Sequence, residues 1–530
     1  MVLSFVFFGL SILFGLLVLF VLGSSFSACL SFFPCSFSVN GGIFEFTCCL
    51  DSSTVICLIM LVVCSLLAFI YCFHYYYGSL DAFSLLYLMV WFVLVMLILI
   101  VTSSPIFTLV MWEYLGFVSF LLILFYSNSS SVRASLITLF SSRFGDVGLF
   151  VVLVYLYCGG PFSWFFFFVF FLVIISKSAG FPFVSWLLEA MRAPTPVSSL
   201  VHSSTLVAAG VWFMVRYGYF LDSVSVFYLF VFSIFTIFVT AVSALFFLDL
   251  KKIVALSTCN NVAWCLVYYI CNDPYLVVFQ LLVHGVCKCS LFILVGDLMS
   301  SSGSSQSSVG LYLSRYGGLY NALLLVFLVF CLCGLPFLGI YFSKHFFFIF
   351  LVGSCYNLLL VFFVLFGFFL SYVYSFRLSL LVCSKVYGIS FGYLASFIFV
   401  SFFVILGTFF GWFILGQYEE YSVLVPVWSL FFLFVQLFGC LAGYCFYNSS
   451  FFGWFWQSIL FGSDSLVGLF YSFYSFLVGV SSLVIYRWEV VLLFSFGRFF
   501  GSSGGSLFYF SLNFIILGIF SFFLFGFVLG

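Results

Sequence analysis

Nearly the whole chain is a succession of apolar segments of about 20 residues, separated by short clusters of glycine, serine and proline. One helical crossing of a bilayer takes about 20 mostly apolar residues, and roughly 15 to 16 segments qualify. Hydrophobic residues make up 66% of the 530 and charged residues 5%, and the mean hydropathy is +1.39, which together exclude a soluble domain. The sequence therefore predicts a protein that crosses a membrane many times.

The crossings are predicted to be helical. Backbone groups in hydrocarbon have no water to bond, so only helices and closed barrels span a bilayer, and runs such as residues 85–101 lack the alternation of a barrel strand. We expect an all-α, polytopic transmembrane helix bundle. The expected crossings lie near residues 1–22, 51–73, 80–102, 105–126, 136–157, 162–188, 197–216, 224–247, 252–271, 275–299, 319–350, 356–380, 393–416, 423–447, 465–486 and 506–529.

Two of these segments share an unusual pattern. When the segments from residue 80 onward are grouped in fives, the fourth member of each group is overlong, is interrupted by glycine and proline, and carries a lysine. Paired interrupted segments indicate a transporter built from repeats, although two unrelated kinks would give the same pattern. The residues concerned are Lys177, Gly180 and Pro182 in the first group and Gly334, Pro336 and Lys344 in the second.

The grouping predicts four parts of the chain. Two five-segment repeats lie between a short N-terminal part and a longer C-terminal part. The predicted parts are residues 1–79, 80–216, 217–385 and 386–530.

Ionisable residues inside the apolar segments are the candidate functional groups. An unpaired charge at the bilayer centre costs at least about 2.5 to 3.5 kcal/mol, so each one needs a partner, water or a function. Glu113 interrupts one segment, and Lys177 lies near the middle of another, too deep to reach an interface. His284 and Lys288 are four residues apart on one helical face and can pass a proton between them. His202 is followed by three hydroxyl residues that can organise water.

Other polar residues carry weaker signals. Arg143 and Asp146 have the spacing of an intrahelical ion pair, and Asp249 and Lys252 lie at a junction between segments; a structural role explains these four equally well. Lys344 follows the second interruption and is included because of the internal parallel with the first.

Cofactor and metal motifs are not found in the sequence. The 19 cysteines form no CxxC pair and are best explained as small apolar residues, and neither a Rossmann glycine pattern, a phosphate-binding loop nor zinc spacing occurs. We therefore expect no cofactor and no metal on this chain.

Six stretches of the sequence together resemble the antiporter-like membrane subunits of respiratory complex I (NADH:ubiquinone oxidoreductase), which are related to multi-subunit cation/proton antiporters. The resemblance is strongest to the subunit 5 branch and covers about residues 51–350. The stretches are WEYLGFVSFLLI (112–123), RFGDVG (143–148), APTPVSSLVHSST (193–205), DLKKIVALST (249–258), His284 with Lys288, and Ser343 with Lys344.

The resemblance implies a function and residue roles. Two inverted five-helix repeats, each with a broken helix, would share a polar axis at mid-membrane depth. In the C-terminal part, residues 448–505 would hold a shortened lateral helix and residues 506–529 an anchor helix. Glu113 and Lys177 would form the switching pair, Lys288 the central relay, His202 and His284 the connectors, and Lys344 the group facing the exit. The family usually has an aspartate after that last lysine, where this chain has His345.

The resemblance also implies partners and a location. Flavin, iron–sulfur clusters and quinone would be held by other subunits, and the partners would be the neighbouring antiporter-like subunit, further membrane and accessory subunits, and lipid, but not nucleic acid. The 88 phenylalanines indicate a coding strand rich in T and G, typical of an organelle genome, so we expect the mitochondrial inner membrane. A sodium/proton antiporter subunit and a structural scaffold that has lost transport remain alternatives.

Overall fold

The structure is a computed structural model that divides into two units, residues 1–463 and 464–530. It describes most of residues 28–449, with gaps at 40–41, 78, 159–163, 272, 302–305, 309–317, 337, 355–357 and 384–425, and scattered residues within 9–16 and 472–490. The crossings expected near 393–416 and 506–529, and the proposed lateral helix, lie wholly or largely outside the described residues.

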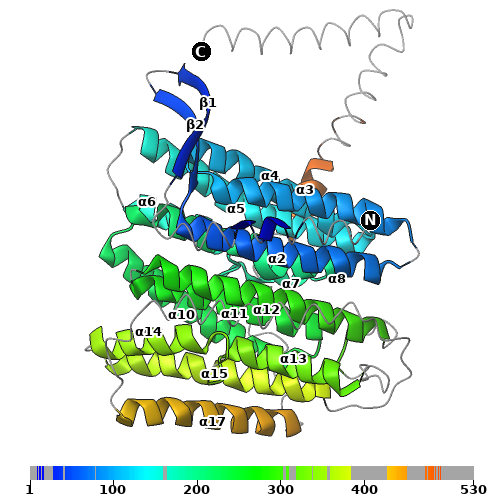
Figure 1. Ribbon diagram of the computed structural model, residues 1–530. Coiled ribbons are helices and arrows are strands. Elements are labelled where there is room, and N and C mark those ends of the chain that lie inside the picture. Colours follow the sequence, from blue (N-terminus) through cyan, green and yellow to red (C-terminus); the bar gives the residue numbers. More distant parts are fainter. Residues whose placement is uncertain are drawn as a thin grey trace, which may run out of the picture. The chain divides into compact units, whose positions relative to one another are not determined.

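The first unit is a helix bundle (Figure 1). Up to residue 220 its helices are α2 (Ser52–Tyr75), α3 (Asp81–Val101), α4 (Pro105–Leu124), α5 (Ser129–Cys158), α6 (Trp164–Lys177), α7 (Val184–Ala190), α8 (Thr195–Val197), the π-helix η1 (Ser198–Thr205), α9 (Leu206–Tyr217) and the 3₁₀-helix η2 (Gly218–Phe220). The later helices are α10 (Ser223–Phe246), α11 (Leu250–Tyr268), the 3₁₀-helix η3 (Tyr269–Cys271), α12 (Pro274–Ser301), α13 (Gly318–Cys333), α14 (Tyr341–Ser354), α15 (Leu358–Cys383) and α17 (Pro426–Asn448).

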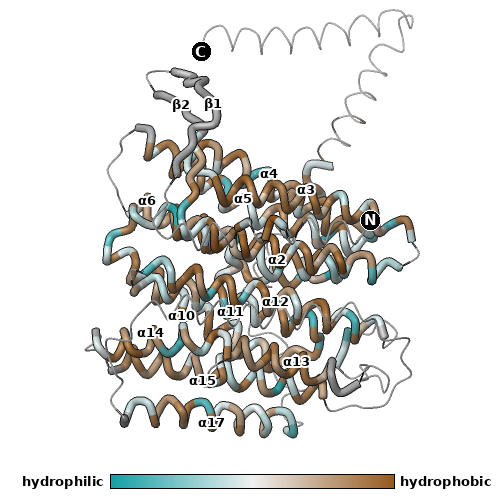
Figure 2. Tube along the Cα trace, viewed as in Figure 1, coloured by the Kyte–Doolittle hydropathy of each residue, from teal (hydrophilic) through white to brown (hydrophobic). Residues whose placement is uncertain are grey.

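The helices have the length and composition of membrane spans. Within the described residues, 9 helical segments are long and apolar enough to cross a bilayer, and three shorter apolar helices accompany them. Figure 2 shows hydrophobic residues along most of each helix, with hydrophilic positions isolated or near helix ends. The prediction of a polytopic all-α bundle is confirmed.

Two of the expected crossings are broken, at the places where glycine and proline interrupt the sequence. The first separates α6 from α7, and Ala179 in it has a positive φ of 54°. The second separates α13 from α14, and Gly334 and Gly339 in it have φ values of 76° and 44°. Because proline lacks a backbone N–H, Pro182 and Pro336 help to end each first half-helix.

A β-hairpin precedes α2 and was not predicted. Strands β1 (Ala28–Val39) and β2 (Gly42–Leu50) pair antiparallel directly before α2. The dipeptide Asn40-Gly41 between them is a hairpin-turn signal in the sequence. The segment between the first expected crossing and α2 therefore forms a two-stranded hairpin, while the candidate membrane spans in the described residues are helical.

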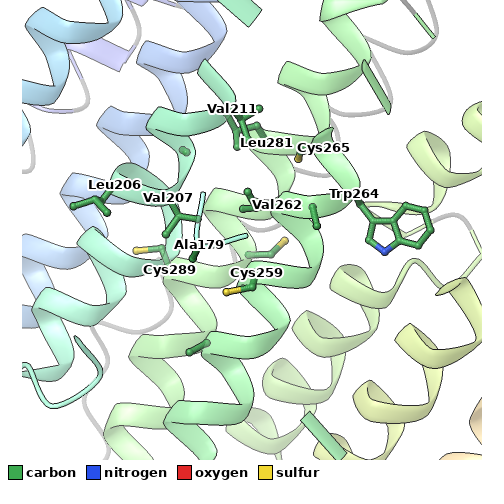
Figure 3. Packing of buried hydrophobic residues seen from close by; sticks show 14 of the residues in the cluster. Ala179, Leu206, Val207, Val211, Cys259, Val262, Trp264, Cys265, Leu281 and Cys289 are labelled. Carbon is green, nitrogen blue, oxygen red and sulfur yellow. The ribbon is translucent and has the colours of Figure 1, made fainter. Parts of the chain in front are cut away.

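The core of the bundle lies where α9, α11 and α12 meet. Helix α12 packs on α2, η1 and α11, while α10 packs on α11 and α15, and α15 on α17. Figure 3 shows side chains such as Val207, Val262 and Cys289 converging between these helices. Helices α11 and α12 are thus largely shielded from lipid, which is the setting that a polar group inside a membrane protein needs.

Candidate functional site

Four charged side chains from α4, α5 and α6 form a row in the first half of the bundle. Arg143 Nη1 donates a hydrogen bond to the Glu113 carboxylate and lies 3.4 Å from Asp146 Oδ2. Lys177 Nζ lies 3.8 Å from Asp146 Oδ1. The Arg143 side chain is 45% exposed and that of Glu113 26%, whereas Asp146 and Lys177 are buried. The row therefore alternates in charge and leads from the surface into the core.

The inner end of this row is Lys177, the last residue of α6. Its Nζ lies 5.2 Å from the centre of the Trp112 ring. A Cβ added to Gly116 would lie 3.6 Å from the same Nζ, an ordinary contact distance, so α4 lies directly beside the ammonium group. The helix break just after it exposes the Ser176 carbonyl, which accepts a hydrogen bond of 3.0 Å from Trp186 Nε1 of α7.

A small cavity lies between Lys177 and His202. Lys177, His202, Ser119 and Ser142 are among the residues that line the cavity, which has about the volume of one water molecule. His202 is fully buried in η1, a π-helical turn of the kind often found at functional sites. Neither of its ring nitrogens has a hydrogen-bond partner among the described residues. A water molecule in the cavity would let the imidazole exchange a proton with Lys177.

Lys288 and His284 lie on α12 at the centre of the bundle, and both are buried. Lys288 Nζ donates to the Ser257 hydroxyl and, at 3.2 Å, to the Val254 carbonyl of α11. A Cβ added to Gly285 would lie 2.7 Å from Met60 Sδ, so α12 approaches α2 closely beside the histidine. The two residues share one face, as their spacing of four requires.

One residue of this face was missed by the sequence analysis. Gln280 is buried on α12 four residues before His284, and its side-chain oxygen accepts a hydrogen bond from Ser343 of α14. Ser343 directly precedes Lys344. The spacing Gln280, His284, Lys288 was the available signal, since residues four apart in a helix share a face.

Lys344 is fully buried at the second helix break. Its Nζ donates hydrogen bonds of 2.7 Å to the Cys333 carbonyl and 2.8 Å to the Ser371 hydroxyl. The hydroxyl of Tyr372 donates to the Gly334 carbonyl at 2.9 Å, and the lysine Nζ lies 4.8 Å from the Tyr372 ring centre. The carbonyls freed at the end of α13 are therefore bound by side chains of α14 and α15.

The two adjacent lysines at the junction before α11 differ in burial. Lys252 and Asp249 form an ion pair of 3.4 Å, and both side chains are partly exposed. Lys251 is the buried neighbour: its Nζ donates to the Ala193 carbonyl at 3.5 Å, and it lies within electrostatic range of His202. Two adjacent lysines give no sequence signal for which one points inward.

Comparison with known proteins shows which family has the sequence that carries these buried charged groups. Residues 103–371, which include every candidate site residue, match the family model described as NADH:quinone oxidoreductase/Mrp antiporter, transmembrane. The chain belongs to this family. The NADH-ubiquinone oxidoreductase chain 5 of Aedes aegypti is 30% identical over 459 residues, 79% of this chain and 76% of the relative. The corresponding chains of Locusta migratoria and Caenorhabditis elegans are 30% and 36% identical, over 62% and 54% of their own lengths.

Solved structures share the antiporter-family fold. An Mrp complex chain from a Dietzia species matches with a TM-score of 0.71 at 19% identity, covering 90% of this chain and 58% of that one. A chain of the membrane-bound sulfane sulfur reductase, an archaeal respiratory membrane complex, matches with a TM-score of 0.64 at 18% identity, covering 84% and 93%.

Within this antiporter-family fold, His345 has an aromatic environment. Its ring stacks on Tyr341, with ring centres 5.5 Å apart, and meets Phe432 of α17 edge-on at 6.4 Å. The adjacent Lys344 is bound by neutral oxygen acceptors. Where related subunits are expected to carry an aspartate, this chain therefore places a side chain that joins α14 to α17 by ring packing.

Proposed function

We propose that this chain is a proton-translocating membrane subunit of a respiratory complex I, related to chain 5 of NADH-ubiquinone oxidoreductase. One observation carries the proposal: five basic side chains are buried inside the bundle, on the helices that lie in chain order from the first helix break to the second. They are Lys177, His202, His284, Lys288 and Lys344. Buried basic groups are costly in a membrane, and a series of them is characteristic of proton relays.

The row of charges beside Lys177 is the proposed switch. At 3.8 Å, the attraction between Lys177 and Asp146 is about 4 kcal/mol with an effective dielectric constant of about 20. Separating the two groups to about 8 Å would remove about 2 kcal/mol of it, a roughly thirtyfold change in the protonation equilibrium of the lysine. A small movement at the first helix break can thus load or release a proton.

The released proton is proposed to pass along the polar axis. The cavity leads from Lys177 to His202, and the shared face of α12 leads from Lys288 through His284 to Gln280 and Ser343. Each added charge raises the cost of the next buried charge, so loading one lysine favours the release of a proton from the following one.

The remaining parts of the proposal concern the assembly. Flavin, iron–sulfur clusters and quinone are proposed to belong to other subunits, which supply the driving force through NADH oxidation. The proposed partners are the neighbouring antiporter-like subunit, other membrane and accessory subunits, and lipid, and the proposed location is the mitochondrial inner membrane. The similarity to the NADH-ubiquinone oxidoreductase chain 5 of Aedes aegypti over 79% of this chain supports this assignment.

Lys177→Met in the assembled complex tests the proposal. We expect proton translocation per NADH oxidised to fall, because methionine keeps the length of the side chain and removes the proton site. A variant complex that assembles and translocates as many protons as the parent would contradict the proposal.

A sodium/proton antiporter subunit is the second candidate, favoured by the fold shared with the Mrp complex. Purification in mild detergent separates the two candidates. Co-migration of this chain with flavin and iron–sulfur proteins supports complex I, and sodium-driven proton exchange without them supports the antiporter.

A further inference from the structure

A polar cluster at one end of the bundle lies outside the series described above. His74 is in the last turn of α2 and Asp297 in the last turn but one of α12, and the imidazole Nε2 lies 3.1 Å from the carboxylate Oδ1. The two side chains are 19% and 30% exposed. They are therefore partly exposed at the ends of their helices and contact each other across two adjacent helices.

Behind this pair lies a buried hydroxyl pair. Tyr71, one turn before His74, has its hydroxyl 3.2 Å from the Thr195 hydroxyl. A Cβ added to Gly296 would lie 2.4 Å from the Tyr71 hydroxyl oxygen and 3.1 Å from Thr195 Cβ, so the glycine allows α12 to approach this pair. The rings of Tyr71 and His74 pack against each other, with centres 6.0 Å apart and an angle of 52° between the ring planes, so the two side chains lie side by side at this end of α2.

Thr195 begins the helical stretch that carries His202. Ser198 and Ser199 follow it at helical spacing, both fully buried, and His202 comes one turn after them. The Ser198 hydroxyl donates to the Thr195 carbonyl at 2.9 Å, and the Ser199 hydroxyl donates to the Pro196 carbonyl at 2.8 Å. A hydroxyl can both donate and accept, so rotation of these groups would let the series pass a proton toward His202.

We propose that His74, Asp297, Tyr71 and Thr195 form an entrance through which protons reach His202 from the side of the membrane where α2 and α12 end. Asp297 takes a proton from water and passes it to the imidazole of His74, and the buried hydroxyls carry it inward. The other ionisable groups within electrostatic range of Tyr71 are Tyr75 and Tyr126. This inference rests on the proposed proton-translocating function.

The double variant His74→Gln/Asp297→Asn tests the entrance. Two amides keep a hydrogen bond between α2 and α12 but cannot bind and release a proton. Since a positioned acid or base speeds proton transfer by about 10² to 10⁴-fold, and water replaces part of that, we expect the initial rate of NADH-driven proton translocation to fall roughly tenfold. Tyr71→Phe, which removes one hydroxyl, should lower it in the same direction and serves if the double variant does not assemble.

A matched control lies at the other end of the same two helices. The hydroxyls of Ser52 and Tyr275 bond at 2.7 Å between α2 and α12, and Ser52→Ala should leave the rate unchanged. An unchanged rate in both the double variant and Tyr71→Phe would overturn the entrance. Lys177→Met, measured in parallel, distinguishes the proposed entrance from the proposed proton-translocating function. If only Lys177→Met stops proton translocation, the proposed entrance is wrong and the proposed function is supported. If Lys177→Met has no effect, the proposed function is wrong.

Discussion

The geometry of the charged row predicts which carboxylate controls Lys177. Asp146 lies 3.8 Å from the lysine and both are buried, whereas Glu113 bonds to Arg143, whose side chain is 45% exposed. Asp146→Asn therefore removes an attraction of about 4 kcal/mol at an effective dielectric constant of about 20. Because 1.4 kcal/mol is a factor of ten, the protonation equilibrium of Lys177 should change roughly a thousandfold. Glu113→Gln weakens a partly exposed pair, for which about 0 to 1 kcal/mol is typical.

The assay is NADH-driven proton translocation by the assembled complex in proteoliposomes, with NADH oxidation measured in parallel. We expect Asp146→Asn to lower the number of protons per NADH more than Glu113→Gln does. Glu189→Gln is the matched control, since Glu189 and Arg192 form another pair with a spacing of three, at 3.0 Å and outside the row. If Glu113→Gln lowers translocation more than Asp146→Asn, the assignment of Asp146 as the controlling group is wrong.

Three further substitutions test the packing and the relay. Gly210→Ala would place a Cβ 2.9 Å from the Ser178 backbone nitrogen and 3.0 Å from the Ile174 carbonyl oxygen, beside the first helix break. This crowding should lower the stability of the purified complex by about 1 to 3 kcal/mol and therefore lower its thermal midpoint. Gly353→Ala is the control, because its Cβ meets no neighbouring atom and should leave the thermal midpoint unchanged. Ser257→Ala removes a hydrogen-bond acceptor of Lys288 and should slow proton translocation without loss of assembly. Tyr372→Phe removes the bond to a carbonyl at the second break and should lower the thermal midpoint, by about 0.5 to 1.5 kcal/mol of stability.

The broken helices could be predicted from the sequence because their causes are local. Glycine accepts a positive φ and proline removes a backbone N–H, so Gly334 and Pro182 mark the breaks wherever the chain goes. The hairpin of β1 and β2 was missed because its apolar residues were read only for membrane-spanning length. Its turn dipeptide was present in the sequence, but a two-residue signal carries little weight among many glycine clusters. The division into two repeats stays a prediction.

The site could be predicted only in part, for a different reason. Charge inside an apolar segment is visible in the sequence, and it selects Lys177, Lys288 and Lys344. Which groups face one another depends on how helices are rotated against each other, and that is a tertiary property. Lys251 shows the limit: a lysine doublet at the start of a helix has one buried and one exposed member, and only the packing of α11 decides which.

The two breaks hold their lysines differently, and this difference bears on how each can be controlled. Lys177 ends the first half of its broken helix and lies against Asp146, a carboxylate on another helix. Lys344 lies in the first turn of the second half of its broken helix, and in the described part of the chain its hydrogen bonds go to the Cys333 carbonyl and the Ser371 hydroxyl. Moving α5 against α6 is enough to change the electrostatics of the first lysine. A movement of the second break changes those of the second, because the Cys333 carbonyl lies at its edge. The protonation of Lys177 would then depend on its distance from a charge, and that of Lys344 on the backbone geometry at the second break. One movement along the bundle could therefore change the protonation of both lysines.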